Sequence, residues 1–320
     1  MRTARLMAWV AVAAALAALP GASGAREPRM QREAGIEVID ESFKTVLRPD
    51  SKVRQIADGL TFTEGPVWYA AGTCLLFSDI PNDTIHKWTQ AKGLEVWRKP
   101  SRNTNGNAVD PEGRVVSCEH GGRQVSRTGK DGKVEVLCST YKGKRLNSPN
   151  DACVAKDGTI WFTDPPYGVK PDQVEQEANY VFRLDPGAKE PVAVASDFGR
   201  PNGICLSPDG KTLYVADSDR AKHHIRRFRI KADKMLEGGE VFCTIDPGGP
   251  DGIRCGSQGR VYSSAGDGVQ VFSPEGKRIG RIVTPLSAAN CAFGGPEFKT
   301  LFITARSGVW AVDLAVPGAK

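Results

Sequence analysis

Polar residues that recur along the chain suggest a cation site. Six of them, called the lead residues below, each precede a short apolar run: Glu64, Asn105, Asn150, Asn202, Asp251 and Asn290. Two are carboxylates, four are amides and none is apolar. Oxygen donors of this kind suit a hard cation, and two carboxylates balance the charge of a divalent ion. Calcium accepts an irregular set of ligands more readily than magnesium does. We therefore expect Ca²⁺, with Mg²⁺, Mn²⁺ and Zn²⁺ as the alternatives.

Turn chemistry is the competing interpretation of these positions. Asn-Gly and Asp-Gly are common in turns, and short polar side chains often bond the local backbone. That explanation suffices for any single lead residue. Glu64 also precedes a glycine, Gly65, but glutamate is not a turn former. Turn chemistry therefore does not explain Glu64. Carboxylates that cluster in a buried site also need a compensating partner, and a cation is the simplest one.

The spacing of the lead residues predicts the fold that brings them together. Successive lead residues are 41, 45, 52, 49 and 39 residues apart, and strand-like segments fill the intervals. A repeat of this length is typical of a β-propeller blade, whose first strand lines a central channel. We therefore predict an all-β fold, a six-bladed β-propeller with a central-channel metal site. Two stacked β-sandwiches would explain the strands but not the recurring polar residue.

The ends of the chain suggest its boundaries. A basic start, an apolar run from Leu6 to Leu19 and small residues up to Ala25 predict a signal peptide over residues 1–25. Residues 26–35 are predicted to be a flexible leader and residues 36–320 the propeller domain. Val53–Ile56 is expected to join the last blade as a strand, because circular closure leaves no exposed sheet edge. The protein is therefore expected to be exported, either periplasmic or secreted.

Composition argues against several classes of partner. The formal net charge is +6 over 320 residues with no long run of lysine or arginine, so nucleic acid is not an expected partner. The apolar run near the start is too short for a comfortable membrane span, so no stable membrane insertion is expected after signal cleavage. Nothing in the sequence specifies an oligomeric state.

Eight cysteines leave two structural possibilities open. In an exported protein an even number suggests disulfides. Cys153 and Cys205, however, each lie three residues after a lead asparagine, at expected strand-interior positions of different blades. Burial as small apolar side chains is at least as well supported there. No Cys-x-x-Cys or Cys/His spacing for zinc is present.

Segments around the lead residues resemble those of a known enzyme family. Four are similar to the signature segments of the gluconolactonase family, the calcium-dependent lactonases that include senescence marker protein and bacterial relatives: Glu64-Gly65-Pro66-Val67-Trp68, Asn147-Ser148-Pro149-Asn150-Asp151, Pro201-Asn202-Gly203 and Pro250-Asp251-Gly252. Two more resemble its bacterial branch: Cys118-Glu119-His120-Gly121 and Phe162-Thr163-Asp164-Pro165-Pro166-Tyr167-Gly168. The resemblance extends from Ile56 to Val312.

The resemblance implies a six-bladed propeller with one catalytic divalent ion in the channel. Four residues match the family's metal-site positions: Glu64, Asn150, Asn202 and Asp251. Five are candidate substrate-binding residues: Asn105, His120, Arg123, Tyr167 and Asn290. Of these, His120, Arg123 and Tyr167 could equally make structural hydrogen bonds at the rim. One position departs from the pattern, because Ser148 stands where the animal members carry an arginine that contacts sugar.

A site of this kind could open a lactone by metal-dependent hydrolysis. The ion would polarise the carbonyl and activate a bound water. Asp251 is the expected catalytic general base, since it can hold both the ion and the water proton, whereas Glu64 is expected to be a ligand only. Serine hydrolysis is not expected, because no Gly-x-Ser-x-Gly motif is present. Two alternatives stay open: a phosphotriesterase-like hydrolase, and a non-enzymatic ligand-binding propeller with a structural ion.

Overall fold

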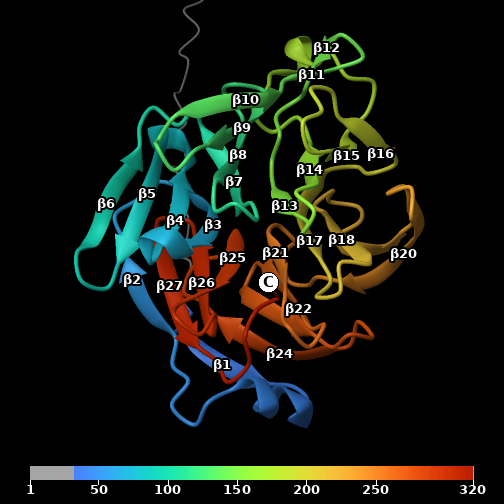
Figure 1. Ribbon diagram of the computed structural model, residues 1–320. Coiled ribbons are helices and arrows are strands. Elements are labelled where there is room, and N and C mark those ends of the chain that lie inside the picture. Colours follow the sequence, from blue (N-terminus) through green and yellow to red (C-terminus); the bar gives the residue numbers. More distant parts are fainter. Residues whose placement is uncertain (1–31, 320) are drawn as a thin grey trace, which may run out of the picture. The chain divides into compact units, whose positions relative to one another are not determined.

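Six antiparallel β-sheets of four or five strands make up most of residues 32–319, the part of the chain that the computed structural model describes (Figure 1). Each sheet is one blade of a β-propeller and is built mainly from strands that follow one another in the sequence. The predicted all-β fold with six blades is therefore confirmed. The predicted signal peptide and the first part of the predicted leader, residues 26–31, lie outside the described residues.

The first three blades each contain four strands. Blade 1 consists of β3 (Thr63–Tyr69), β4 (Cys74–Asp79), β5 (Thr84–Thr89) and β6 (Gly93–Arg98). Blade 2 consists of β7 (Thr104–Val109), β8 (Val115–Glu119), β9 (Gln124–Thr128) and β10 (Val134–Cys138). Blade 3 consists of β13 (Ala152–Val154), β14 (Ile160–Asp164), β15 (Tyr180–Leu184) and β16 (Val192–Ala195).

The last three blades include two strands from the start of the described chain. Blade 4 consists of β17 (Pro201–Leu206), β18 (Thr212–Asp217), β19 (His224–Ile230) and β20 (Leu236–Thr244). Blade 5 consists of β21 (Ile253–Cys255), β22 (Val261–Ala265), β23 (Gly268–Phe272), β24 (Arg278–Val283) and β1 (Gly35–Val38). Blade 6 consists of β25 (Asn290–Gly294), β26 (Thr300–Ala305), β27 (Gly308–Asp313) and β2 (Arg54–Ala57).

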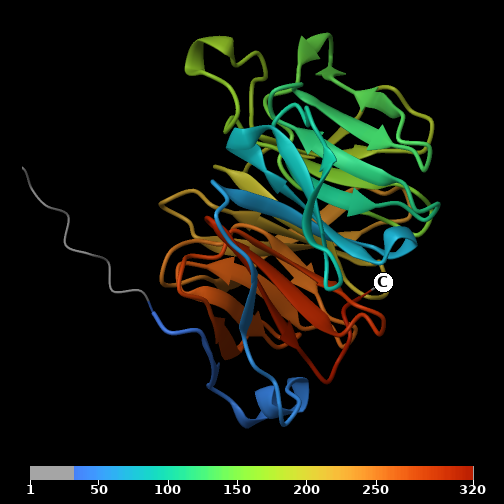
Figure 2. The same cartoon turned by 90° about the vertical axis from the view of Figure 1, so that its left-hand side faces the viewer.

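Strand β2 closes the ring of blades. It pairs antiparallel with β27, with Arg54 opposite Ala311 and Gln55 opposite Trp310. A strand from the N-terminal part of the chain thus completes the C-terminal blade, as predicted for Val53–Ile56. The innermost strands contact one another in order from β3 to β25, and β25 contacts β3 again (Figure 1). The turned view shows blade 1 and blade 6 side by side, as this closure requires (Figure 2).

Apolar side chains fill the spaces between neighbouring blades. Within residues 32–319 the buried apolar side chains form six clusters, one at each interface between adjacent blades. Trp161 and Phe228 meet between blades 3 and 4, and Phe77 and Phe302 between blades 1 and 6. Because both faces of each sheet are covered, the second strands are apolar at consecutive positions instead of alternating.

Short elements connect strands within blades and between them. Four are 3₁₀ helices: η1 (Glu41–Val46), η2 (Ala70–Gly72), η3 (Ile80–Asn82) and η4 (Pro171–Gln173). The strands β11 (Thr140–Tyr141) and β12 (Lys144–Arg145) form a small hairpin between blades 2 and 3. Across residues 32–319, no helix has the length and apolarity that a membrane crossing needs.

All eight cysteines lie in the described residues and carry free thiols. Seven are buried and Cys153 is half-buried. Burial raises the pKa of these thiols, that of Cys138 to about 12, which leaves them protonated and unreactive at neutral pH. The sequence left disulfides and buried free thiols open, and the structure contains buried free thiols.

Candidate metal and substrate site

The six lead residues gather at one end of the inner strands. Four occupy the first or second position of their strand and two lie two residues ahead of it. Five of them line one cavity of about 430 Å³: Glu64, Asn105, Asn150, Asn202 and Asp251. Asn290 is buried next to that wall, against Glu64. The blades thus bring together residues that lie up to 226 positions apart.

Hydrogen bonds link the lead side chains of blades 2 to 5. Nδ2 of Asn105 donates to Oδ1 of Asn150 over 2.6 Å. Nδ2 of Asn150 donates to Oδ1 of Asn202 over 2.5 Å. The Asn202 side chain in turn bonds the Asp251 carboxylate. The amides therefore form a continuous row that ends at a carboxylate.

Glu64 is held by a separate pair of donors. Its Oε2 accepts from the Gly65 backbone N–H over 2.5 Å and from Nδ2 of Asn290 over 2.9 Å. Oδ1 of Asn290 accepts from the backbone N–H of Cys291 over 2.8 Å, which fixes the direction of the amide. Glu64 is thus oriented more tightly than Asp251.

Acidic residues at the ends of second strands hold the segments that precede several lead residues. Asp79 accepts from the backbone N–H groups of Thr61 and Phe62, just ahead of Glu64. Asp217 accepts from Gly199 and Arg200, just ahead of Asn202. Asp164 accepts from Asn147 over 2.8 Å, just ahead of Asn150. These bonds fix where each inner strand begins and hence where its lead side chain lies.

The glycines that follow lead residues have a packing role that turn chemistry does not explain. A Cβ atom at Gly65 would lie 1.9 Å from the carbonyl oxygen of Asn105, and one at Gly203 would lie 2.2 Å from that of Asp251. Both contacts are with the lead residue of the next blade. Only glycine allows successive inner strands to approach this closely, so the Glu-Gly and Asn-Gly repeats are conditions for closing the ring.

Negative charge accumulates in the cavity wall. Desolvation and the charges of Asp251 and Asp151 raise the pKa of Glu64 well above its usual value. Desolvation, followed by the charge of Asp151, raises the pKa of Asp251 to about 7, against the lowering effect of its bond to Asn202. Carboxylates in this situation are stabilised by a cation or by a proton.

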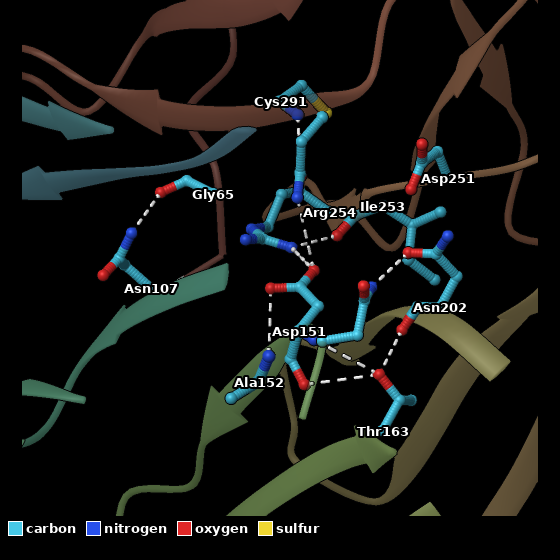
Figure 3. Close-up of polar contacts among 12 residues, drawn as sticks. Gly65, Asn107, Asp151, Ala152, Thr163, Asn202, Asp251, Ile253, Arg254 and Cys291 are labelled. Atoms are coloured by element: carbon cyan, nitrogen blue, oxygen red, sulfur yellow. Dashed lines mark hydrogen bonds and ion pairs between the residues drawn. The ribbon is translucent and has the colours of Figure 1, made fainter. Parts of the chain in front are cut away.

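Asp151 is a third acidic residue of the channel, and sequence reasoning missed it. It occupies the position after Asn150, where four other lead residues are followed by glycine. Its Oδ2 accepts from Nη1 of Arg254 over 3.1 Å, and Oδ1 accepts from the Ala152 N–H (Figure 3). Asp151 also lies 3.5 Å from Nδ2 of Asn290. Two signals in the sequence could have revealed it: the departure from the glycine pattern, and its place in the segment Asn147-Ser148-Pro149-Asn150-Asp151.

His120 and Tyr167 both line the cavity, as candidate substrate-binding residues should. Nε2 of His120 lies 3.3 Å from Nδ2 of Asn105 and 3.3 Å from Oδ1 of Asn150. Burial lowers the pKa of His120 to about 4, so the ring is neutral at neutral pH. The Tyr167 hydroxyl bonds the side chains of Ser218 and Asn202, and desolvation raises its pKa.

Arg123 lies outside the cavity that the lead residues line. Its Nε donates to the carbonyl oxygens of Leu146 and Asn147, and its Nη1 pairs with Glu175 over 3.3 Å. Of the two roles that the sequence allowed for this residue, these contacts match the structural one. It lines a neighbouring hollow of about 450 Å³.

Ser148 has a structural role as well. Its hydroxyl donates to the Pro165 carbonyl over 2.6 Å and accepts from the Gly168 N–H over 2.8 Å. Ser148 therefore anchors the loop that carries Tyr167.

The residues present fit a hard divalent cation. Oδ1 of Asn105 is buried and has no hydrogen-bond partner in residues 32–319. Glu64 and Asp251 are buried or half-buried carboxylates whose pKa values are raised by desolvation and by neighbouring negative charge. Across the same residues no three His, Cys, Asp or Glu side chains form a ligand set by themselves. Amide oxygens would have to complete the set, which favours calcium over a softer metal.

A second cavity, of about 600 Å³, opens beyond the other end of several inner strands. Cys153, Cys205 and Cys255 contribute to its wall, as does Arg254. None of the lead residues lines it. The Asp151–Arg254 pair therefore lies between the lead residues and this second cavity.

Known proteins resemble this chain over nearly its whole length. Residues 62–307 match the family described as SMP-30/Gluconolactonase/LRE-like region. A gluconolactonase from Zymomonas mobilis is 33% identical over 339 residues, which cover 96% of this chain and 94% of that protein. The structure of a gluconolactonase from Xanthomonas campestris is 36% identical with a TM-score of 0.82, covering 88% of this chain and 98% of that one. The calcium-binding protein regucalcin from Agrobacterium tumefaciens shares the fold at 20% identity, with a TM-score of 0.69 over 89% of this chain and 95% of that one.

Fold and site together define a six-bladed propeller with a polar cavity at the head of its inner strands. The chain belongs to the SMP-30/gluconolactonase/LRE-like family, as its signature segments implied.

Proposed function

We propose that this protein is an enzyme that hydrolyses lactones with the help of a divalent cation held by its lead residues. The observation that carries the proposal is the cavity of about 430 Å³ whose wall combines amide side chains with two carboxylates of raised pKa. The gluconolactonases from Zymomonas mobilis and Xanthomonas campestris support lactones as the substrate class.

Four residues would hold the cation: Glu64, Asn150, Asn202 and Asp251. Calcium is the proposed ion, because the donors are all oxygen and mostly amide. When bound, the cation would polarise the lactone carbonyl and stabilise the negative charge that develops on its oxygen. The unpartnered Oδ1 of Asn105 would bind a water molecule or the substrate beside it.

Asp251 is the proposed general base. It has fewer hydrogen-bond donors than Glu64 to restrain it, so its carboxylate can accept a proton from a water molecule beside the cation. Asp251 would take a proton from water as the water oxygen attacks the carbonyl carbon. The bond from that carbon to the ring oxygen then breaks, and Asp251 returns the proton to the ring oxygen. The product is a hydroxy acid.

The other cavity residues would position the substrate. His120 is neutral, so it would accept or donate a hydrogen bond without transferring a proton at neutral pH. The Tyr167 hydroxyl is held by Ser218 and Asn202 at the cavity wall and would contact substrate hydroxyl groups. Asn290 orients Glu64, so its effect on the substrate would be indirect.

The test is hydrolysis of a panel of lactones by the purified protein. Activity is measured after chelation and again after adding Ca²⁺, Mg²⁺, Mn²⁺ or Zn²⁺, with an aryl phosphotriester as a parallel substrate. Loss of lactone hydrolysis on chelation and recovery with one ion would support the proposal. Turnover of the phosphotriester alone would favour the phosphotriesterase alternative. A folded protein that binds the ion but turns over neither substrate would favour the ligand-binding alternative.

We also propose that the protein is exported, from the pattern of residues 1–25. The test is sequencing of the N-terminus after expression with the complete chain. A mature protein outside the cytoplasm that begins near Arg26 would support export. A cytoplasmic protein that retains residues 1–25 would contradict it.

A further inference from the structure

Arg306 places a guanidinium without an ionic partner at the wall of the cavity. The residue is exposed and lines the same cavity as Glu64 and Asp251. Within residues 32–319, Arg306 forms no ion pair, and its side chain forms no hydrogen bond. Among the described residues that line this cavity it is the only lysine or arginine. Its positive charge is therefore available to a ligand.

The backbone at Arg306 adopts a conformation that usually requires glycine. Arg306 has φ +54° and is the first of the two residues that connect β26 to β27, where Ala305 pairs with Gly308. The corresponding connection of blade 5, between Ala265 and Gly268, has Gly266 at this place. A residue with a side chain is uncommon at positive φ, and such positions concentrate at ligand sites. Ten residues other than glycine have positive φ within residues 32–319, and Arg306 and His223 are the two of them that line this cavity.

Two backbone hydrogen bonds fix the Arg306 hairpin, and one ring contact places its guanidinium. The Arg306 carbonyl accepts from the Thr63 N–H over 2.7 Å, and the Ser307 carbonyl accepts from the Leu60 N–H over 3.0 Å. The guanidinium carbon lies 5.3 Å from the centre of the Phe62 ring. The hairpin is thus attached to the segment that leads into Glu64. A guanidinium held in this way is oriented before any ligand binds.

The charges of the cavity favour an anionic ligand. Glu64 and Asp251 together balance a divalent ion, and Arg306 then remains as one surplus positive charge. A guanidinium binds a carboxylate or a phosphate through two parallel hydrogen bonds. Arg306 acts on Asp251 through its charge but forms no ion pair with it. Its guanidinium therefore remains free to bind a charged group of the ligand.

We propose that Arg306 is a specificity-determining residue that binds an acidic group on the substrate, so that the preferred substrates are anionic lactones. The acidic group is a carboxylate or a phosphate on the part of the molecule away from the lactone carbonyl. This inference rests on the proposed lactonase function and names the substrate class of that site.

The test compares three lactones with wild type and Arg306→Gln. D-glucono-1,5-lactone is neutral, D-glucaro-1,4-lactone carries a carboxylate and 6-phospho-D-glucono-1,5-lactone carries a phosphate. Wild type should prefer one acidic lactone by about tenfold or more in kcat/KM, and that lactone identifies the group. Arg306→Gln should lose this preference through a higher KM for the acidic lactone. Added salt should reduce the preference of the wild type.

A glycine variant separates the functional role from a structural one. Arg306→Gly removes the guanidinium but suits the positive φ, so its thermal stability should equal or exceed that of the wild type. It should nevertheless lose the preference for the acidic lactone as Arg306→Gln does. Arg229→Gln, on the outer part of blade 4, makes the same change in net charge far from the cavity and should keep the preference.

Each result decides the inference. Hydrolysis of the neutral lactone without a preference for either acidic one, or a preference that Arg306→Gln and Arg306→Gly retain, overturns it and leaves the proposed function intact. If the wild type hydrolyses no lactone, the proposed function fails, and binding of D-glucarate in the presence of Ca²⁺ becomes the measurement. Glucarate binding weakened about tenfold by Arg306→Gln then supports an acid-binding Arg306, and equal binding overturns it.

Discussion

Arg254 of blade 5 and Asp151 of blade 3 form an ion pair inside the channel, with Nη1 and Oδ2 3.1 Å apart. Only 1% of the Asp151 side chain and 18% of the Arg254 side chain are exposed. The pair lies next to Glu64 and Asp251, whose pKa values the charge of Asp151 raises. Arg254 compensates Asp151, so two carboxylates remain for a divalent ion. The pair thus matches the charge of the site to that of its proposed cation.

Removing one partner of this pair should cost more stability than removing both. Asp151→Asn leaves the Arg254 charge partly buried without a partner, and we expect a loss of about 3 kcal/mol in the free energy of unfolding. The double variant Asp151→Asn/Arg254→Met should recover most of that loss, because no unpaired charge remains. Urea unfolding of the three proteins in saturating Ca²⁺ measures both values. Equal stability of the single variant and the wild type would contradict this view of the pair.

Asp251→Asn should change activity and stability in opposite directions. Loss of the general base should lower kcat for lactone hydrolysis by about 10²- to 10⁴-fold. In chelator, the same variant should unfold at a temperature at least as high as the wild type, because a carboxylate repelled by Asp151 has been removed. Steady-state kinetics and thermal unfolding in chelator provide the two measurements. Asp58→Asn, at an exposed site outside the cavity, is the matched control and should change neither.

The blades and the lead residues could be predicted because both depend on local pattern. Strand-forming runs and turns recur at blade length, and a residue at the head of an inner strand must face the channel mouth. Glu64 and Asp251 therefore follow from their positions. The strand at Val53–Ile56 could be placed in the last blade because a ring of blades has to close.

The Asp151–Arg254 pair could not be predicted, because it joins residues 103 positions apart through the geometry of two non-adjacent blades. The position of Arg123 could not be predicted from the sequence either. Its guanidinium bonds the Leu146 carbonyl, and only the fold shows that it lies outside the cavity that the lead residues line. The glycines after lead residues were visible in the sequence, but their contact with the next blade needed the structure.

Calcium should stabilise the protein more at about pH 8 than at about pH 5. Without the ion, the raised pKa values of Glu64 and Asp251 mean that protons neutralise these groups at low pH. Calcium has to displace those protons, so its apparent affinity should be about 100-fold weaker at pH 5 than at pH 8. Calorimetric titration at both pH values measures the difference. An affinity that does not change with pH would contradict the assignment of these carboxylates as ligands, and Asp251→Asn should show a smaller pH dependence.

Asp164 should make the protein less stable as the pH rises toward 7. Burial raises its pKa from 3.8 to about 7, so the folded state binds this proton more tightly than the unfolded state does. The stabilisation is complete below pH 3.8 and is lost as the pH rises through about 7. It amounts to on the order of 4 kcal/mol. Asp164→Asn lacks this proton, so its stability relative to the wild type should increase by that order between about pH 4 and pH 8.

Urea unfolding of both proteins in saturating Ca²⁺ measures the change. Any weakening of the hydrogen bond from the Asn147 N–H in Asp164→Asn does not vary with pH and cancels in the comparison. A stability difference between the two proteins that is the same at both pH values would sink this prediction.

Gly203→Ala should disturb the cavity although no functional side chain is removed. The new Cβ atom would lie 2.2 Å from the Asp251 carbonyl oxygen and 2.7 Å from the Ile253 nitrogen, both backbone atoms of the neighbouring inner strand. The strand has to move, and we expect a loss of about 3 kcal/mol in the free energy of unfolding. Because Asp251 moves with it, calcium affinity should also fall, by about tenfold or more.

Gly35→Ala is the matched control, since nothing lies within 4 Å of its Cβ position, and its stability should stay within about 0.5 kcal/mol of the wild type. If Gly203→Ala behaves like Gly35→Ala in urea unfolding and calcium titration, the close approach of the inner strands does not determine the position of Asp251.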